Sequence, residues 1–184
     1  MPANQKTTIR FMKQVDNQSA EALIQCVERE FREGVKRFRI LVSSPGGFVD
    51  PGLSVFNYLK GIPVEEIETV NFGSVDSIAA VIFCAGTKRI SVPNARFIIH
   101  DISRNTSQPL NLSETTLVEW VEGLRIDRQN IAKVIAETCK KEIEEIQKLM
   151  RGGAVLGSVA AQDLGLVTQI DQKIVEDGAK LITV

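Results

Sequence analysis

The residue in this sequence whose surroundings suit a nucleophile is Ser77. It follows residues 73–76 (GSVD), which end an apolar run, and it precedes the apolar residues 78–83. This pattern predicts a turn between a strand and a helix, where the first backbone N–H groups of the helix have no partner within it. Such N–H groups stabilise the oxyanion that forms when a hydroxyl attacks a carbonyl carbon. Ser77 is therefore a candidate nucleophile for acyl transfer.

A nucleophilic serine also needs a base, because its hydroxyl is hardly ionised near neutral pH. The one histidine of the chain, His100, ends the apolar run 96–99 and is the candidate base. A serine before a helix can instead be a helix cap, and a histidine at a strand end can be a surface residue. Spacing by itself leaves both interpretations open. Residues 44–47 (SPGG) follow another apolar run, and their glycines would let a further backbone N–H approach a substrate closely.

Strands and helices are expected to alternate along the chain. Strands are expected at 38–43, 66–72, 88–92, 96–100 and 166–170, and helices at 19–33, 51–59, 77–85, 113–138, 143–150 and 160–164. This alternation is typical of an α/β fold with a largely parallel sheet. No repeat or linker divides the sequence, so we expect residues 1–184 to form a single domain.

Composition argues against several classes of partner. The formal net charge is -1, so no strong field favours nucleic acid or an anionic membrane, and no apolar run approaches the roughly 20 residues of a membrane span. One histidine and the absence of CxxC and HExxH patterns argue against a metal site, and no cofactor is expected. Three distant cysteines, at positions 26, 84 and 139, lie among apolar neighbours, which predicts reduced core thiols and a cytoplasmic protein.

Five motifs occur together in an order that resembles the proteolytic subunit of the Clp protease family. They are SPGG at 44–47, GxxxSxAA at 73–80, AGxKR at 85–89, PNAR at 93–96 leading to IIH at 98–100, and AxxLGLV at 161–167. The likeness covers roughly residues 9–175. It implies the ClpP/crotonase fold, with repeated β-β-α units and a protruding helical handle near 113–138. Residues 108–112 would lie in the part of the handle that flanks the substrate.

The resemblance also implies roles for single residues. Ser77 falls on the nucleophile of the family, His100 on its general base, and Gly47 and Ile78 on the two N–H donors of its oxyanion hole. The substrates would be peptides or unfolded proteins, and the chain would assemble into homo-oligomeric rings, which the resemblance implies are heptameric. The apolar face between Leu117 and Ile135 exceeds what a small domain buries, which also favours an oligomer.

The third member of the triad departs from the family pattern. The family has an aspartate where this chain has Gly153, or Gly152 if the alignment is shifted by one residue. Losing the function of that acid lowers kcat about 10⁴-fold in Ser-His-Asp enzymes. A backbone carbonyl could hold the imidazole instead, leaving a Ser-His dyad. The carboxylates weighed as substitutes are Asp101, Asp163 and Asp171, each more typical of a surface residue, whereas Asp76 is expected to interact with a helix start.

Three functions compete. The first is a serine peptidase of the Clp family with an altered or missing acid, and the second is a catalytically impaired paralogue that serves as a structural or regulatory ring subunit. The third is a crotonase-type enzyme that acts on acyl-CoA. Dependence on a Clp-type ATPase stays open, because the strand at 38–42 (FRILV) lacks the tyrosines that help to form the docking pocket of the family.

Overall fold

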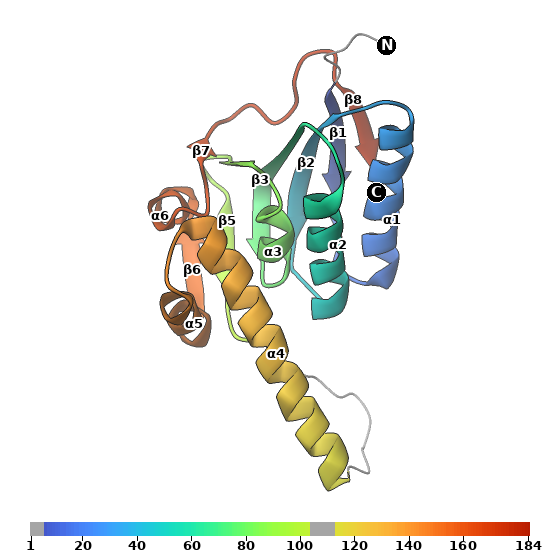
Figure 1. Cartoon of the computed structure of the whole chain (residues 1–184). Helices are drawn as coiled ribbons and strands as arrows, with labels where there is room; N and C mark the ends of the chain where they lie inside the picture. Colours follow the sequence, from blue (N-terminus) through green and yellow to red (C-terminus); the bar gives the residue numbers. More distant parts are fainter. Residues whose placement is uncertain (1–5, 104–112) are drawn as a thin grey trace.

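The computed structural model describes residues 6–103 and 113–184, and within these ranges the chain forms eight strands and six helices around one sheet (Figure 1). In chain order the elements are β1 (Lys6–Phe11), α1 (Asn17–Arg32), β2 (Arg37–Ser44), α2 (Val49–Gly61), β3 (Glu66–Asp76), α3 (Ala79–Phe83), β4 (Lys88–Ser91), β5 (Arg96–Ile99), α4 (Glu114–Cys139), α5 (Ile143–Gly152), β6 (Ala154–Gly157), α6 (Ser158–Leu164), β7 (Gln169–Ile170) and β8 (Lys180–Thr183).

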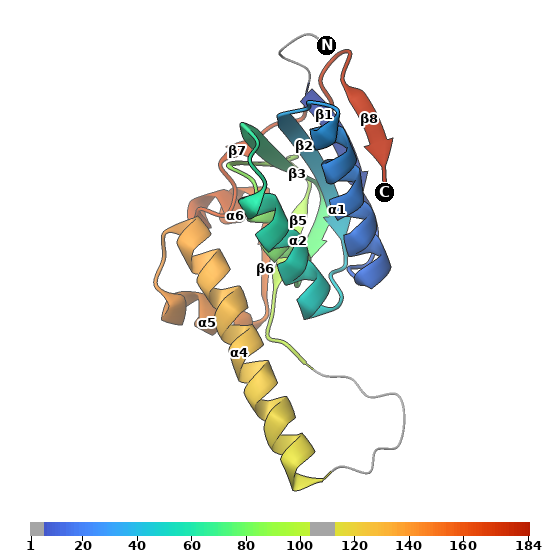
Figure 2. The ribbon, with the colours of Figure 1, turned by 45° about the vertical axis from the view of Figure 1, so that its right-hand side comes forward.

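The strand order of the sheet is β6-β5-β3-β2-β1-β8, with β4 pairing to β3 and β7. All of these pairs are parallel except that of β5 with β6, which is antiparallel. The parallel strands therefore end at a common edge, where the loops that follow β2, β3 and β5 meet. Helices α1, α2 and α3 cover one face of the sheet (Figures 1 and 2).

The main core lies between that face and the helices. Phe11, Phe38, Phe83 and Phe97 are fully buried, and the rings of Phe83 and Phe97 meet edge to face with centroids 5.1 Å apart. Burial of each such side chain stabilises the fold by about 1.5–3 kcal/mol. The packing of α3 against β5 at this ring pair holds the ends of β3 and β5 in a fixed relation.

Helix α4 protrudes from the body of the molecule, as the handle prediction requires (Figures 1 and 2). Ser113 caps its start by accepting a hydrogen bond from the N–H of Thr116. Its C-terminal half packs into the core, where Ile135 is only 1% exposed, but the side chain of Leu117 near its start is 46% exposed. The predicted apolar stripe is thus buried along only half of its length. The substrate-flanking residues predicted at 108–112 lie outside the described residues.

Most predicted elements are present, but three strands were missed and one was drawn too long. The missed strands are β1, β6 and β8, and the strand expected at 166–170 is only Gln169–Ile170. Short strands of mixed polarity carry little periodic signal, so pairing across the sheet decides them. The three cysteines are free and buried, and burial raises the pKa of Cys84 to about 12 and that of Cys139 to about 11. No helix in the described ranges has both the length and the apolarity to span a bilayer.

Candidate active site

Ser77 occupies a sharp turn between β3 and α3. Its backbone φ is +58°, one of two positive values among the described residues that are not glycine. Its N–H donates a hydrogen bond to the carbonyl of Ile98 on β5, with a nitrogen–oxygen distance of 2.7 Å. The left-handed conformation costs a residue with a Cβ roughly 1–2 kcal/mol, and such strain persists where the surrounding structure enforces it, often at functional sites. The turn presents the partly exposed Ser77 side chain at the carboxyl edge of the sheet.

The loop after β2 packs directly against this turn. Gly46 has a φ of +84°, and a Cβ built on it would lie 2.6 Å from the Cβ of Ser77 and 2.7 Å from the carbonyl oxygen of Asp76. Gly47 is held against Val15, whose carbonyl oxygen would lie 2.1 Å from a Cβ on that glycine. At both positions neighbouring atoms lie too close for any residue with a Cβ, so glycine is required there by packing and not by turn preference alone.

Two backbone N–H groups at this edge have no acceptor among the residues that the structure describes. Within the described ranges, neither the N–H of Gly47 nor that of Ile78 donates a hydrogen bond. Ile78 is buried, and an unpaired buried N–H is costly and therefore rare. These are the two positions that the resemblance assigns to oxyanion stabilisation.

His100 follows β5 at the same edge and is exposed. The parallel register pairs Asp76 with Ile98, so the chain leaves both strands side by side on its way to Ser77 and His100. The ring nitrogen Nδ1 of His100 lies 2.7 Å from the carbonyl oxygen of Asp101. A carbonyl can only accept, so Nδ1 carries the proton and Nε2 keeps the lone pair that a base needs. In this structure no hydrogen bond joins the described side chains of Ser77 and His100.

The glycine at the expected acid position lies directly before β6, the strand that pairs with β5. The antiparallel register of β5 and β6 pairs Arg96 with Gly157 and ends with Ile99 opposite Ala154. His100 directly follows this paired segment on β5 and Gly153 directly precedes it on β6, so both residues lie at the same end of the ladder. Gly153 ends α5 with a φ of +67°, and a Cβ on it would meet no atom within 4 Å. Space for a side chain is therefore present there.

Asp101 contacts the imidazole through its backbone, not through its carboxylate. β5 ends at Ile99, so Asp101 lies beyond the strand. Its Oδ1 accepts hydrogen bonds from Nε of Arg128 at 2.7 Å and from the N–H of Ile102 at 2.9 Å. Burial alone would raise the pKa of Asp101, but these bonds and the charges of Arg128 and Arg151 lower it.

The other carboxylates considered as substitutes lie elsewhere. Asp163 is exposed on α6, and Asp171 accepts hydrogen bonds from Gln169 and Lys173 beyond β7. Asp76, which we expected at a helix start, accepts a hydrogen bond from Ser74 and pairs with Arg96 at 3.5 Å. In the described part of the chain, no carboxylate contacts the ring of His100.

Comparison with known proteins identifies the family. A family model described as Clp protease matches residues 3–173. The chain belongs to the Clp protease family. It is 29% identical over 160 residues to ATP-dependent Clp protease proteolytic subunit 1 of Tropheryma whipplei (strain Twist), covering 85% of this chain and 76% of that protein.

Two further matches agree with this membership. An ATP-dependent Clp protease proteolytic subunit of Streptococcus pyogenes (strain Manfredo) is 27% identical over 135 residues, which cover 72% of this chain and 67% of that protein. The structure of a ClpP1 mutant from Listeria monocytogenes matches with a TM-score of 0.81 and 23% identity, over 90% of this chain and 91% of that one. The predicted family and α/β fold are confirmed, and membership supports a serine peptidase of the ClpP kind.

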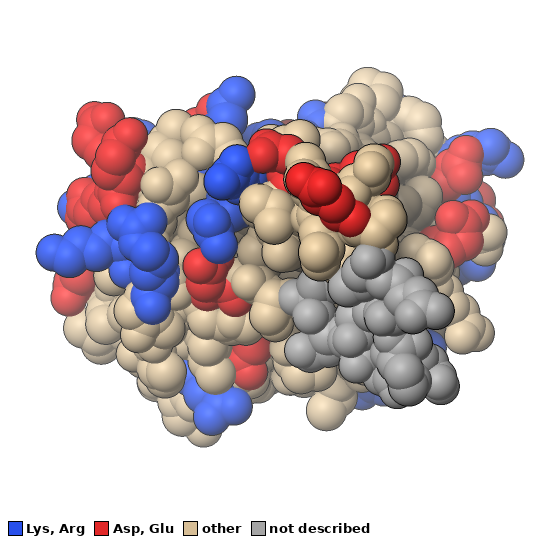
Figure 3. Space-filling model, turned by 90° about the horizontal axis from the view of Figure 1, so that it is seen from below, with Lys and Arg blue, Asp and Glu red and all other residues tan. Residues whose placement is uncertain are grey.

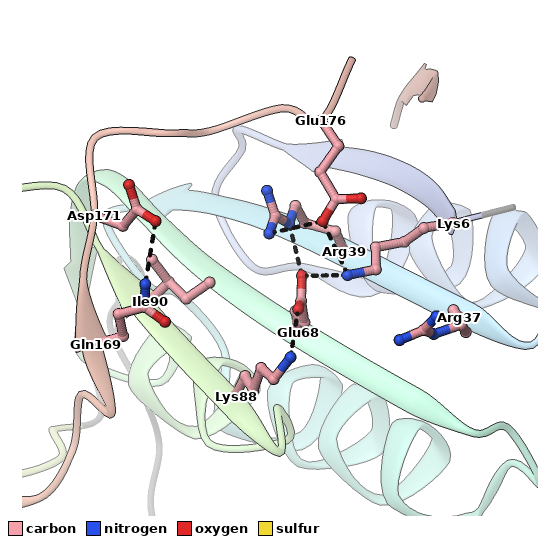
Figure 4. A pocket seen from close by; sticks show the side chains of 9 residues that line it. All are labelled: Lys6, Arg37, Arg39, Glu68, Lys88, Ile90, Gln169, Asp171 and Glu176. Atoms are coloured by element: carbon pink, nitrogen blue, oxygen red, sulfur yellow. Dashed lines mark hydrogen bonds and ion pairs between the residues drawn. The ribbon is translucent and has the colours of Figure 1, made fainter. Parts of the chain in front are cut away.

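A charged pocket lies on the other face of the sheet (Figure 4). Phe38 and Ile40 of β2 join the main core, so the intervening Arg39 points away from the covering helices. Arg39 and Glu68 form an ion pair of 2.7 Å with side chains 8% and 3% exposed, and Lys6 lies 2.9 Å from the same carboxylate. The pocket has a volume of about 440 Å³ and is lined mainly by charged residues. The absence of tyrosines from β2 was visible in the sequence, whereas the ion-pair network was not predicted from it.

Figure 3 views the molecule from below, towards the end of the sheet at which the loops after β3 and β5 lie. Lysine and arginine side chains are interspersed there with aspartate and glutamate, and neither sign dominates this face. The mixture agrees with a formal net charge of -1.

Proposed function

We propose that this chain is a serine peptidase acting on peptides or unfolded polypeptides, with Ser77 as nucleophile and His100 as base. The observation that carries the proposal is the strained backbone of Ser77 beneath the Gly46-Gly47 loop, beside two N–H groups without acceptors. A serine that only capped a helix would not need a left-handed backbone or the close approach of a glycine.

The proposed reaction uses these groups in turn. Oγ of Ser77 attacks the peptide carbonyl, and Nε2 of His100 takes the hydroxyl proton. The N–H groups of Gly47 and Ile78 donate to the oxyanion of the tetrahedral intermediate. Protonated His100 then gives its proton to the leaving amine, and water activated by the same nitrogen hydrolyses the acyl-enzyme.

His100 works in this scheme as part of a dyad supported by the carbonyl of Asp101. That carbonyl fixes the proton on Nδ1, but it is neutral and stabilises an imidazolium less than a carboxylate does. Turnover slower than that of a Ser-His-Asp enzyme is expected.

The second candidate is an impaired subunit with a structural or regulatory role in a ring. The exposed apolar side chains of Leu117, Val118 and Val121 on the protruding part of α4 favour assembly. We propose that residues 1–184 form a single domain. Copies of the chain would assemble into a homo-oligomeric ring, with seven subunits as the family resemblance implies. An ATPase partner that inserts an apolar anchor beside β2 is not part of the proposal, because Arg39 and Glu68 make that surface ionic.

Labelling with a fluorophosphonate probe and hydrolysis of small peptide esters test the peptidase. The wild type should be labelled and active, and Ser77→Ala should lose both properties. Ser54→Ala is the matched control, because Ser54 is exposed on α2 and its hydroxyl only bonds the carbonyl of Asp50. Labelling that persists in Ser77→Ala contradicts the assignment, and a folded wild type without labelling or turnover favours the impaired subunit. Protection from thermal unfolding by acyl-CoA would support the crotonase alternative instead.

A further inference from the structure

One contact near the candidate base has no part in the proposed reaction, namely the ion pair between Asp101 and Arg128. Nε of Arg128 on α4 lies 2.7 Å from Oδ1 of Asp101, although the two residues are 27 positions apart. The two side chains are 34% and 32% exposed, so the pair contributes little to stability by itself. Figure 2 shows the chain after β5 passing close to α4.

Hydrogen bonds hold both the carboxylate and the backbone carbonyl of Asp101. Its carboxylate is fixed by Arg128 and by the N–H of Ile102, while its carbonyl accepts the Nδ1 proton of His100. A carboxylate tied to a helix restricts the rotation of its own backbone, and so restricts the direction of the carbonyl. This carbonyl is the only described hydrogen-bond partner of the ring in the structured ranges.

We propose that Arg128 is a positioning residue that, through Asp101, keeps the His100 imidazole in the Nδ1–H tautomer. The role of the pair in catalysis rests on the proposed function, whereas its effect on the tautomer does not. Without the ion pair the carbonyl is free to turn, and the ring can exchange its proton to Nε2. A neutral imidazole protonated on Nε2 has no lone pair there for the proton of a serine.

The charges around Asp101 agree with a carboxylate that stays ionised. Arg128 of α4 and Arg151 of α5 both lower its pKa, against the opposing effect of burial. A lowered pKa keeps Asp101 ionised at neutral pH, so its carboxylate can accept from Arg128 there. The anchor comes from the helix that protrudes from the body, and no sequence motif connects that helix to the base.

The chain contains one histidine, which allows a direct measurement of the tautomer. In protein labelled with 15N-histidine and freed of any affinity tag, the two ring nitrogens report which of them carries the proton. With the ring neutral, wild type should show Nδ1 protonated, and Arg128→Met should show a mixture of tautomers. Arg125→Met should match wild type, because Arg125 lies on the same helix but pairs with Glu122.

Kinetics give the second readout. Arg128→Met should lower kcat about tenfold to 100-fold with little change in KM, since small misplacements of a catalytic group have effects of this size. Arg128→Lys should recover part of the loss. Asp101→Asn should resemble Arg128→Met, and the double variant should be no worse than either, because both changes break one link.

The proposal is overturned if the wild-type ring is protonated on Nε2, or if Arg128→Met matches Arg125→Met in tautomer and kcat. A Ser77-independent activity would refute the proposed function and leave the tautomer result standing. Measuring the tautomer in Ser77→Ala as well separates the two questions, because that variant needs no activity. Thermal unfolding of each variant shows whether Arg128→Met remains folded, and Arg128→Lys retains the charge if it does not.

Discussion

An aspartate introduced at Gly153 probes whether the missing acid limits the activity of this chain. The last pair of the β5–β6 ladder is Ile99 with Ala154, so His100 and residue 153 leave the ladder at the same end, and opposite residues in an antiparallel pair have Cβ atoms about 4.5–5.5 Å apart. A carboxylate at this distance can reach an imidazole nitrogen. Nothing lies within 4 Å of the Cβ position, so Gly153→Asp meets no steric obstacle.

The loss of stability and the gain in kcat expected for Gly153→Asp can both be bounded. A residue with a Cβ at a φ of +67° loses about 1–2 kcal/mol of stability, with aspartate and asparagine at the lower end. A triad acid is worth about 10⁴ in kcat in Ser-His-Asp enzymes. The carbonyl of Asp101 already orients the imidazole ring, so an added carboxylate can supply only part of this increase in kcat. We expect a rise of about tenfold to 100-fold, equivalent to about 1.4–2.7 kcal/mol of the barrier.

The assay compares the wild type with three variants by fluorophosphonate labelling rate and by kcat on a peptide ester. Gly153→Asn is the control, because it has nearly the same shape and backbone strain as Gly153→Asp but no charge. Gly152→Asp tests the alternative alignment, and a Cβ there also meets nothing within 4 Å. If Gly153→Asp and Gly153→Asn are both folded and equally active, the argument that a carboxylate is missing beside His100 is refuted.

Two further predictions concern the site loop and the charged pocket. Gly46→Ala should abolish fluorophosphonate labelling, because its Cβ clashes with the turn that carries Ser77. Gly34→Ala is the control: its φ of +93° is similar but the space around it is open, so it should only lose about 1 kcal/mol of stability in urea unfolding. Equal labelling of the two variants would contradict the packing argument. Burial would raise the pKa of Glu66, but Lys88, Lys6 and Arg37 lower it to about 2. The contribution of Glu66 to the free energy of unfolding is therefore fully present above its ordinary pKa of 4.5 and is lost as pH falls towards 2. Urea unfolding from neutral to acidic pH should show a larger loss in wild type and in the exposed control Glu65→Gln than in Glu66→Gln, because Asp101 and Glu68 also have a lowered pKa and keep part of the pH dependence in every variant. Identical pH profiles for all three would rule out the linkage.

The sequence alone determined the candidates and most of the framework around them. The spacing of the serine and the two glycine motifs predicted a turn at Ser77 and a loop at residues 44–47, because turn residues and apolar periodicity act locally. The helices at α1, α4 and α5 were predicted for the same reason. The prediction that Gly153 stands at the position of the acid also came from the sequence, since it needs only an alignment of motifs along the chain.

Tertiary structure alone decided what surrounds those residues. The pairing of β5 with β6 brings the segment after Gly153 beside the segment before His100, and a strand of four residues carries too little pattern to predict its partner. The link from Arg128 to Asp101 joins segments 27 residues apart through a single ion pair, which leaves no periodic signal. Local propensity and hydrophobic spacing report what each segment prefers, whereas these contacts depend on where the packed sheet and helices bring distant side chains together.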